Sequence, residues 1–448
     1  MVLSRRFAKD LMSKLPAVKE VKDAEQEMEE EEEVRTCCLG GVSSRPASRP
    51  LGNLSRGSVN QQTVHRSSSV RGLLLTKSTT DAEKEDEESI RGLFQYSRNI
   101  SETDEDLDMD LELREVKEAY DPTGRKKYLE ACKAYGVVPI SFFLRHMVDA
   151  SLTMRHHGLG PQGTKALAVT LIANTAIVKL NLGDNWMEAD GAEAIADMLK
   201  ENCFILDIDL SDNNIGYEGA QALCAMLMEN ISLLKLNLSG NKLEDQVAEH
   251  FAEAFSNNRK LKSLDLSHNV LGDIAGEILG PAIAENAGLE VLNLSWNALR
   301  GNGAVHIAKG LGANIFLRVL DLSYNGFGNE GAAMLGEALK INNGLEELNI
   351  SNNRITLAGA LQLSLGLQEN KSLKILSMAR NPMQSTGCFG VLKAIQANLE
   401  SAIEFLDFSD ISVDEAFDKL YYTMKSLNPV LSVRHKGNNP ISFVDKRK

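Results

Sequence analysis

Long apolar runs are missing from this 448-residue sequence, which has no stretch of 18 consecutive apolar residues. A helix needs about 20 such residues to cross a bilayer, so we expect no membrane span. The first 15 residues carry Arg5, Arg6, Lys9, Asp10 and Lys14 among their apolar residues, which leaves no room for the apolar core of a secretory signal. We therefore expect a cytoplasmic chain.

Cysteine and aromatic residues are scarce. The six cysteines follow neither the spacing of a disulfide framework nor that of a zinc site. Cys203, Cys224 and Cys388 fall in segments of helical periodicity, where we expect them to be small core residues in a reducing compartment. Aromatic residues make up only 5% of the chain, so Leu, Ile, Val and Ala must supply the core.

Motifs of catalysis and of metal or cofactor binding are missing as well. No Gly-x-Ser-x-Gly elbow occurs, and the glycines recur singly instead of clustering into a phosphate-binding loop. His156 and His157 have no cysteine or acidic residue at metal-ligand spacing. The formal net charge of −14 argues against nucleic-acid binding, which needs clustered lysine and arginine. We expect no enzyme, no cofactor and no metal. The acidic surface favours either a basic partner or simply solubility.

The sequence does contain a repeat, because an asparagine returns every 28 residues. Each asparagine ends the pattern apolar-x-x-apolar-x-apolar-x-x-Asn, as in the stretch from Leu289 to Asn297. The alternation of the inner apolar residues predicts a short strand with one buried face. The recurring residues are Asn185, Asn213, Asn241, Asn269, Asn297, Asn325, Asn353 and Asn381. We expect their side-chain amides to bond to backbone groups that the strand leaves unpaired where it turns away.

The second half of each unit predicts a helix. In the unit after Asn185, for example, apolar residues fall at helical spacing at Ala192, Ile195, Met198 and Leu199. A second asparagine series follows these segments, and we expect it to end the helices in the left-handed conformation. It comprises Asn174, Asn202, Asn230, Asn258, Asn286, Asn314, Asn342, Asn370 and Asn398. A single unit of strand, turn and helix cannot bury a core alone, so the units must stack into a solenoid.

These patterns resemble a known family. Leu-x-x-Leu-x-Leu-x-x-Asn with a helical second half is similar to the leucine-rich repeat, and the 28-residue step resembles its ribonuclease-inhibitor-type subclass. The resemblance implies an α/β horseshoe with a parallel sheet on the concave face and helices on the convex face. The segment 128–146 ahead of the repeats also resembles the segment that leads into the repeats in one group of such proteins.

The chain divides into four predicted parts. Residues 1–118 are expected to form a disordered acidic and Ser/Arg-rich arm, because few apolar residues are present to offset the entropy of ordering. A helical N-terminal cap with a degenerate first repeat spans 119–176, and eight 28-residue repeats span 177–400. Residues 401–448 hold a degenerate last repeat, a cap helix and a basic tail. In the first repeat His157 takes the place of the asparagine.

Four segments outside the regular repeats carry specific expectations. The serines of the Ser/Arg-rich stretch are either phosphorylation sites or part of an unmodified linker. Residues 104–115, where apolar and acidic residues alternate, either cover the first edge of the sheet or bind a partner. Ser412 to Glu415 has the form of a capping box at the start of the last helix. The basic tail begins at Arg434.

Binding residues are expected on the concave face, where alternation points side chains outward. The eighth position of the pattern is the most informative, because neighbouring repeats place His268, Trp296 and Tyr324 side by side. Aromatic residues dominate binding hot spots, so we predict a recognition patch from these three residues with Val291 and Val319 and an acidic rim of Asp209, Asp265 and Asp321. The alternative is that these positions carry bulky residues by drift or pack them over a turn.

The sequence therefore predicts a non-catalytic, monomeric intracellular scaffold that binds a protein partner on its concave face. One alternative is a GTPase-activating protein, since the related Ran GTPase-activating protein shares the architecture; Arg300, Arg354 and Arg380 are the arginines to test. Another alternative is a structural component of a cytoskeletal or ciliary assembly, by analogy of fold alone.

Overall fold

The computed structural model describes residue 121 and residues 123–436. The described residues all belong to the unit Leu111–Lys448. The predicted arm, the segment 104–115 and most of the predicted basic tail lie outside the described residues. Within the described part, no helix is long and apolar enough to cross a membrane.

Within the described residues, eleven short strands form one parallel sheet, and their order in the sheet is their order in the sequence. Neighbouring regular strands pair one repeat apart, so that Lys179 pairs with Asp207 and Val291 with Val319. The strands are β1 (Ser151–Thr153), β2 (Lys179–Asn181), β3 (Asp207–Asp209), β4 (Lys235–Asn237), β5 (Ser263–Asp265), β6 (Val291–Asn293), β7 (Val319–Asp321), β8 (Glu347–Asn349), β9 (Ile375–Ser377), β10 (Phe405–Ser412) and β11 (Ser432–Lys436).

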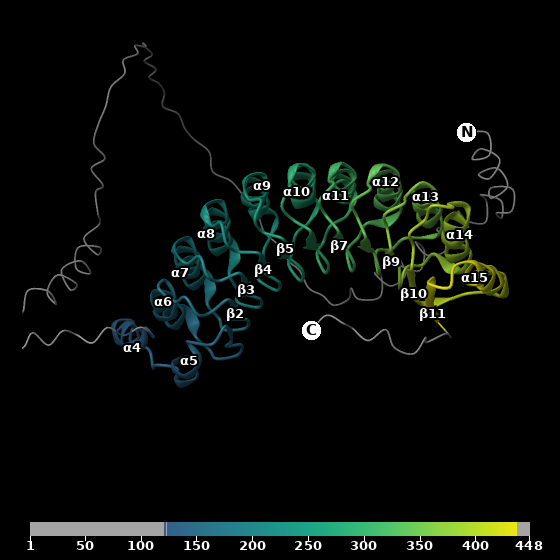
Figure 1. The fold of residues 1–448 in the computed structure, drawn as a ribbon. Helices are drawn as coiled ribbons and strands as arrows, with labels where there is room; N and C mark the ends of the chain where they lie inside the picture. The colour runs from purple at the N-terminus through teal and green to yellow at the C-terminus, as the bar shows by residue number, and fades with distance from the viewer. Residues whose placement is uncertain (1–120, 122, 437–448) are drawn as a thin grey trace, which may run out of the picture. The chain divides into compact units, whose positions relative to one another are not determined.

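A helix follows each strand from β1 to β10. In Figure 1 the strands line the inner side of the arc of repeats and the helices its outer side, which confirms the predicted parallel sheet of a leucine-rich repeat solenoid. The helices are α4 (Arg125–Ala134), α5 (Ser141–His146), α6 (Gly160–Leu171), α7 (Glu188–Glu201), α8 (Gly216–Glu229), α9 (Ala248–Asn257, after the 3-10 turn η2, Asp245–Val247), α10 (Asp273–Glu285), α11 (Gly301–Ala313), α12 (Gly328–Ile341), α13 (Leu357–Leu367), α14 (Gln384–Ala397) and α15 (Glu415–Leu427).

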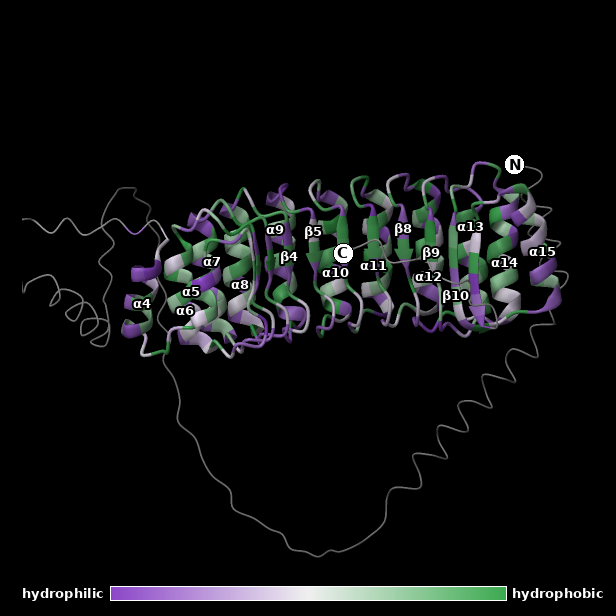
Figure 2. Cartoon of the chain, turned by 60° about the horizontal axis from the view of Figure 1, so that its bottom comes forward, coloured by the Kyte–Doolittle hydropathy of each residue, from purple (hydrophilic) through white to green (hydrophobic). Residues whose placement is uncertain are grey.

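The core is one continuous apolar layer between the sheet and the helices. Each repeat contributes the same buried positions, for example Leu264 and Leu266 around β5, Leu271 in the following turn and Leu279 in α10. Hydrophobic residues therefore recur on the strands and helices of successive repeats (Figure 2). Because every repeat buries its face against the next one, stability comes from nearest-neighbour interfaces.

The first asparagine series joins neighbouring repeats, as expected. Asn213 donates from Nδ2 to the carbonyl oxygens of Leu182 (2.9 Å), Leu210 (3.0 Å) and Ser211 (3.0 Å), and its Oδ1 accepts the amide of Asn185 (2.9 Å). The side chain is completely buried. It satisfies backbone groups that the turn away from the strand would leave without partners.

The second asparagine series departs from the expectation. The residues that cap helices have φ between −66° and −95° with ψ from 100° to 134°, which is extended backbone and not the left-handed conformation. The reason lies in their side chains. Asn342, for example, donates from Nδ2 to the carbonyl oxygens of Leu311 and Asn314 in the preceding repeat, and its Oδ1 accepts the amides of Gly344 and Leu345. The extended backbone leads directly into the next strand.

The N-terminal end of the solenoid is closed by α4 and α5. Tyr128 of α4 packs edge-on against Phe143 of α5, with ring centroids 4.6 Å apart, and burial raises the pKa of Tyr128 to about 12. β1 pairs with β2 in the regular register. His157 occupies the asparagine position of this first repeat. Its backbone amide donates to Asn185 Oδ1 at 2.9 Å, and its Nδ1 lies 2.9 Å from the carbonyl oxygen of Arg155.

The C-terminal end corrects two expectations. The capping box is wrong: Ser412 belongs to β10, and Asp414 caps α15 by accepting the amide of Phe417 at 2.9 Å. The basic tail does not begin at Arg434, because that residue lies in β11, which pairs with β10. The sequence pattern does not predict this strand. Its inward-facing residues are Val433 and His435, and His435 is buried although it is not apolar.

Candidate functional site

The eighth position of each repeat adopts a left-handed backbone. Its φ lies between 52° and 58° in Asp184, Asp212, His268, Trp296, Tyr324, Asn352 and Arg380, and is 72° in Gly240. The repeat imposes this geometry, because the amide of each such residue donates to a carbonyl just beyond the next strand, as Trp296 does to Ser323 at 2.9 Å. These side chains therefore form one row along the C-terminal ends of the strands.

Three rings of this row are stacked. The imidazole of His268 lies 5.2 Å from the indole of Trp296 at an interplanar angle of 14°, and the indole lies 3.8 Å from the phenol of Tyr324 at 9°. Both faces of the indole are thus covered, yet the residue is 47% exposed. Solvent and a partner reach mainly the ring edge, which carries the positive side of the quadrupole and the indole N–H donor.

The two valines of the predicted patch lie on the same face but not beside the rings. Val291 is the first residue of β6 and Trp296 lies three residues beyond the end of that strand. Extended residues advance about 3.3 Å each, so the Cα atoms of the two residues lie at most roughly 16 Å apart. Val291 is exposed and Val319 half-buried. The structure therefore divides the predicted patch into a ring stack and a separate apolar pair.

The acidic rim has a structural task that the sequence analysis missed. Asp265 accepts the amide of Ser267 at 2.8 Å and the side-chain amide of Asn293 at 2.9 Å. Asp209 and Asp321 make the equivalent pair of bonds. Carboxylates on adjacent strands would repel each other. Here the strands between the aspartates carry asparagines, whose side-chain amides donate hydrogen bonds to the carboxylates and so prevent the repulsion. The alternation of Asn and Asp at the fifth position was the available signal.

Arg380 extends the ring stack toward the C-terminal end. Its guanidinium donates to the hydroxyl of Tyr324, two repeats away, and to Asp410 at 2.8 Å. The carboxylate of Asp410 raises the pKa of Arg380 above its ordinary value. The repeat pattern does not predict the contact between Arg380 and Tyr324, because the contact spans 56 residues and passes over Asn352.

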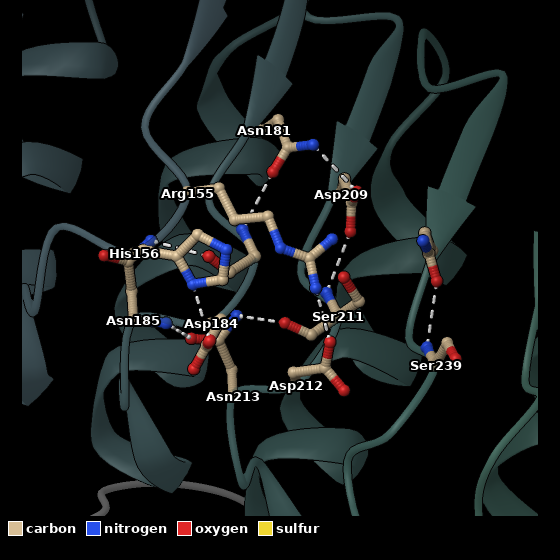
Figure 3. Close-up of polar contacts among 12 residues, drawn as sticks. Arg155, His156, Asn181, Asp184, Asn185, Asp209, Ser211, Asp212, Asn213 and Ser239 are labelled. Atoms are coloured by element: carbon tan, nitrogen blue, oxygen red, sulfur yellow. Dashed lines mark hydrogen bonds and ion pairs between the residues drawn. The ribbon is translucent and has the colours of Figure 1, made fainter.

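The N-terminal half of the row is polar (Figure 3). His156 Nδ1 lies 2.6 Å from Asp184 Oδ2, and Arg155 reaches across from the turn after β1 to Asp212 at 2.6 Å. Gly240 separates the two halves, and a Cβ atom there would overlap the carboxylate of Asp212. The row therefore consists of an ion-paired half and an aromatic half. In the part of the chain that the structure describes, no group of three His, Cys, Asp or Glu side chains could hold a metal ion.

The comparisons with known proteins agree with this architecture. A family model described as "Leucine Rich repeat" matches residues 173–196, 201–224, 229–249, 257–278, 285–308, 313–336 and 342–364. Residues 173–364 thus hold leucine-rich repeats. Leucine-rich repeats are interaction modules, whose stacked units form extended concave surfaces for protein partners.

Individual relatives match only in part. Human leucine-rich repeat-containing protein 74B is 55% identical over 47 residues, which are 10% of this chain and 12% of that protein. The mouse protein of the same name is 53% identical over 50 residues, 11% of this chain and 13% of that protein. The match thus spans about an eighth of these relatives. The solved structure of Leiomodin-1 Actin-Binding Site 2 is 19% identical with a TM-score of 0.29, and its match covers 41% of this chain and 89% of that one.

The arginines that a GTPase-activating protein would need lie on turns of the leucine-rich repeats. Arg380 is held by Asp410 and Tyr324 as described above, and Arg300 lies 3.9 Å from the carboxylate of Asp273. Arg354 is exposed, with a left-handed backbone. These observations give no support to a catalytic arginine.

Proposed function

We propose that the leucine-rich repeats form a non-catalytic scaffold that docks a partner protein on the concave face, with Trp296 at the centre of the contact. The observation that carries this proposal is the half-exposed stack of His268, Trp296 and Tyr324. Stacking holds the three rings in one orientation before the partner arrives, so little side-chain entropy is lost on binding.

The backbone at these positions supports a binding role for the rings. A left-handed φ is unfavourable for large side chains and is best tolerated by Gly, Asn and Asp. Those small residues do occupy the same position in other repeats, at Asp184, Asp212, Gly240 and Asn352. The fold alone would thus be served by a small residue in each of the three aromatic repeats. Trp and Tyr are the residue types that dominate binding hot spots.

The surroundings of the rings indicate the chemistry of the partner. Asp265 and Asp321 precede His268 and Tyr324 by three residues and place half-buried carboxylates on the same face. The exposed edge of the indole offers an N–H donor. A partner with an apolar anchor, a hydrogen-bond acceptor and basic groups nearby fits this arrangement.

The test is a double variant with a matched control. Trp296→Asn with Tyr324→Asn removes both rings and introduces the residue that occupies the same turn at Asn352, so the fold is kept. Trp186→Asn is the control, because Trp186 is 72% exposed and has a φ of 58° but lies in another repeat, outside the ring stack. A partner isolated with the intact chain should bind the double variant about 30-fold more weakly or worse, the loss expected for a hot spot of about 2 kcal/mol.

Tryptophan fluorescence tests the location directly. The chain has two tryptophans, so in the Trp186→Asn variant Trp296 is the only indole. Partner binding should shift its emission and shield it from iodide quenching. Equal affinity of the partner for the double variant and the control, together with unchanged emission, would show that the ring stack is not the docking site.

A further inference from the structure

The sheet ends at β11 with an open edge. β11 pairs with β10 on one side, and in the described part of the chain no strand lies on the other. In the regular repeats the amide at the sixth position donates to the next strand, as Leu182 does to Asp209 and Met378 to Asp407, both at 2.8 Å. His435 holds this position in β11, so its amide is directed to where a twelfth strand would pair.

The two faces of β11 differ in character. Val433 and His435 point to the helix layer and are buried, His435 to 8% exposure. Its Nε2 atom makes no hydrogen bond and lies 3.9 Å from Asp418 Oδ1. The side chains of Arg434 and Lys436 belong to the opposite face. A further strand would therefore meet apolar surroundings on one face and basic groups on the other.

The helix layer is also incomplete at this end. α15 has only two buried residues, Phe417 and Met424, whereas α12 has six, because no helix follows α15 in the described part. Leu427 is 78% exposed, and Tyr422 and Val430 are exposed as well. Apolar surface near β11 thus remains open to water, which an added strand with apolar side chains on this face would reduce.

The charges of β11 favour an acidic strand over a basic one as its pairing partner. Lys436 is exposed, and Arg434 lies 5.5 Å over the ring of Phe405 and 3.5 Å from Asp407. β11 itself carries no acidic residue. A second copy that paired through β11 would bring these like charges together across the new pair, which is unfavourable. An acidic strand instead would place opposite charges side by side.

We propose that β11 is an acceptor edge that adds one extended, parallel segment of a partner protein in which apolar residues alternate with acidic ones. Backbone hydrogen bonds would continue the sheet and supply affinity, and the alternating side chains would supply specificity. The apolar side chains lie on the same face as Val433 and His435 and cover the open flank of α15. The acidic side chains lie beside Arg434 and Lys436. This surface is separate from the ring stack and does not depend on it.

The test uses the full chain and nine-residue synthetic peptides that alternate leucine with glutamate. In this sheet the outward-facing residues donate their amides to the preceding strand, as Lys179 does to Ala150 at 3.0 Å. N-methylation of the glutamates should therefore abolish binding, whereas N-methylation of the leucines should leave the affinity within about twofold. Equal effects of the two methylated peptides would overturn strand addition.

A charge exchange tests the chemistry of the occupant. Lys436→Glu should weaken the Leu/Glu peptide at least fivefold and permit binding of a Leu/Lys peptide. Lys235→Glu, an exposed lysine on the interior strand β4, changes the net charge equally and should change neither. If Lys235→Glu weakened binding of the Leu/Glu peptide as much as Lys436→Glu does, only the overall charge of the chain would affect binding, and the proposal would fail.

Three other occupants would appear in the same experiments. A dimer that sedimentation detects in the intact chain and not in Lys436→Glu would assign the edge to a second copy. Peptide binding to residues 1–436 but not to the full chain would assign it to residues 437–448. Peptide binding to residues 119–448 but not to the full chain would assign it to the segment 104–115, in which apolar and acidic residues alternate. Each of these results overturns the assignment to a partner.

Discussion

The indole of Trp296 lies parallel to the phenol of Tyr324, with ring centroids 3.8 Å apart and an interplanar angle of 9°. The two residues are one repeat apart, and both have the left-handed backbone, with φ of 53° and 54°. Since the same turn recurs at each step of the solenoid, identical backbone geometry makes the two rings parallel. The spacing of parallel strands, about 4.8 Å, brings them within stacking distance.

Replacement of Trp296 should separate the stability effect of the ring from that of the backbone. Trp296→Asn loses a stacking contact worth about 1 kcal/mol. It also relieves the strain of a large side chain on a left-handed backbone, which is roughly as large as the lost stacking energy. We expect its urea midpoint to stay close to that of the intact chain. Trp296→Val loses the stack and keeps the strain, so it should be less stable than Trp296→Asn by about 2 kcal/mol. Equal midpoints for the two variants would contradict this balance.

Two adjacent asparagines give a matched test of the second ladder. Asn342 is buried and makes four hydrogen bonds to backbone groups, whereas Asn343 is exposed and makes one long contact of 3.4 Å. Asn342→Ala leaves buried carbonyl and amide groups without partners, at about 1–3 kcal/mol each. We expect it to lower the free energy of unfolding by at least 2 kcal/mol, and Asn343→Ala to change it by less than about 0.5 kcal/mol. Chemical denaturation measures both.

Close approach of α10 and α11 should make Gly310 irreplaceable. A Cβ atom at Gly310 would lie 2.1 Å from the carbonyl oxygen of Gly280, which is backbone and cannot yield. Helix propensity alone favours Gly→Ala by about 1 kcal/mol, but the overlap outweighs it, so Gly310→Ala should destabilise by about 1–3 kcal/mol. Gly312 in the same helix has 3.3 Å to its nearest neighbours. Gly312→Ala should be near neutral in thermal unfolding.

The buried thiols should show both low reactivity and a dependence of stability on pH. Burial raises the pKa of Cys388 to about 12 from an ordinary value of 9.0, and it also raises the pKa of Cys224. Cys203 is exposed and follows the end of α7, so the expected core position is wrong for this cysteine. At pH 8 a disulfide reagent should therefore modify Cys203 rapidly and the two buried thiols only on unfolding. The measurement uses a variant with Cys37→Ser and Cys38→Ser, which removes the thiols outside the described residues.

The sign of the pH effect follows from the raised pKa. In the unfolded chain the Cys388 thiol ionises near pH 9, whereas in the folded chain it stays protonated until about pH 12. Its contribution to stability is complete below pH 9 and is lost as the pH rises toward 12. Cys388→Ala should flatten the fall in stability over this range, after allowance for the smaller side chain. An unchanged slope would mean that the thiol does not titrate in this way.

The regular repeats were predictable because each one repeats a local pattern. The alternation of Leu264 and Leu266 and the asparagine that follows at position 269 identify strand and turn without knowledge of the neighbours. The ends were harder to predict, because a terminal strand lacks the repeat signal. His435 is buried only because Phe417 and Val433 surround it, and no local pattern shows a histidine in a core position.

The candidate site was predictable only as a row of residues. The sequence places His268, Trp296 and Tyr324 in register, but it cannot give the left-handed turn that stacks them or show that the faces of the indole are covered. It also did not reveal that Arg380 reaches Tyr324 over an intervening repeat. The groups that a long side chain contacts depend on distances in three dimensions. A sequence pattern of single positions does not contain these distances.

The sequence by itself determined the solenoid. Apolar residues and asparagines recur every 28 residues, and units of this kind bury their apolar faces by stacking on one another. The tertiary structure alone decided what the surface presents. It turned the indole edge of Trp296 outward, engaged Asp265 and Asp321 in amide bonds, and left β11 as the last strand of the sheet. Burial follows from periodicity, whereas the exposure and pairing of polar groups depend on which repeats become neighbours.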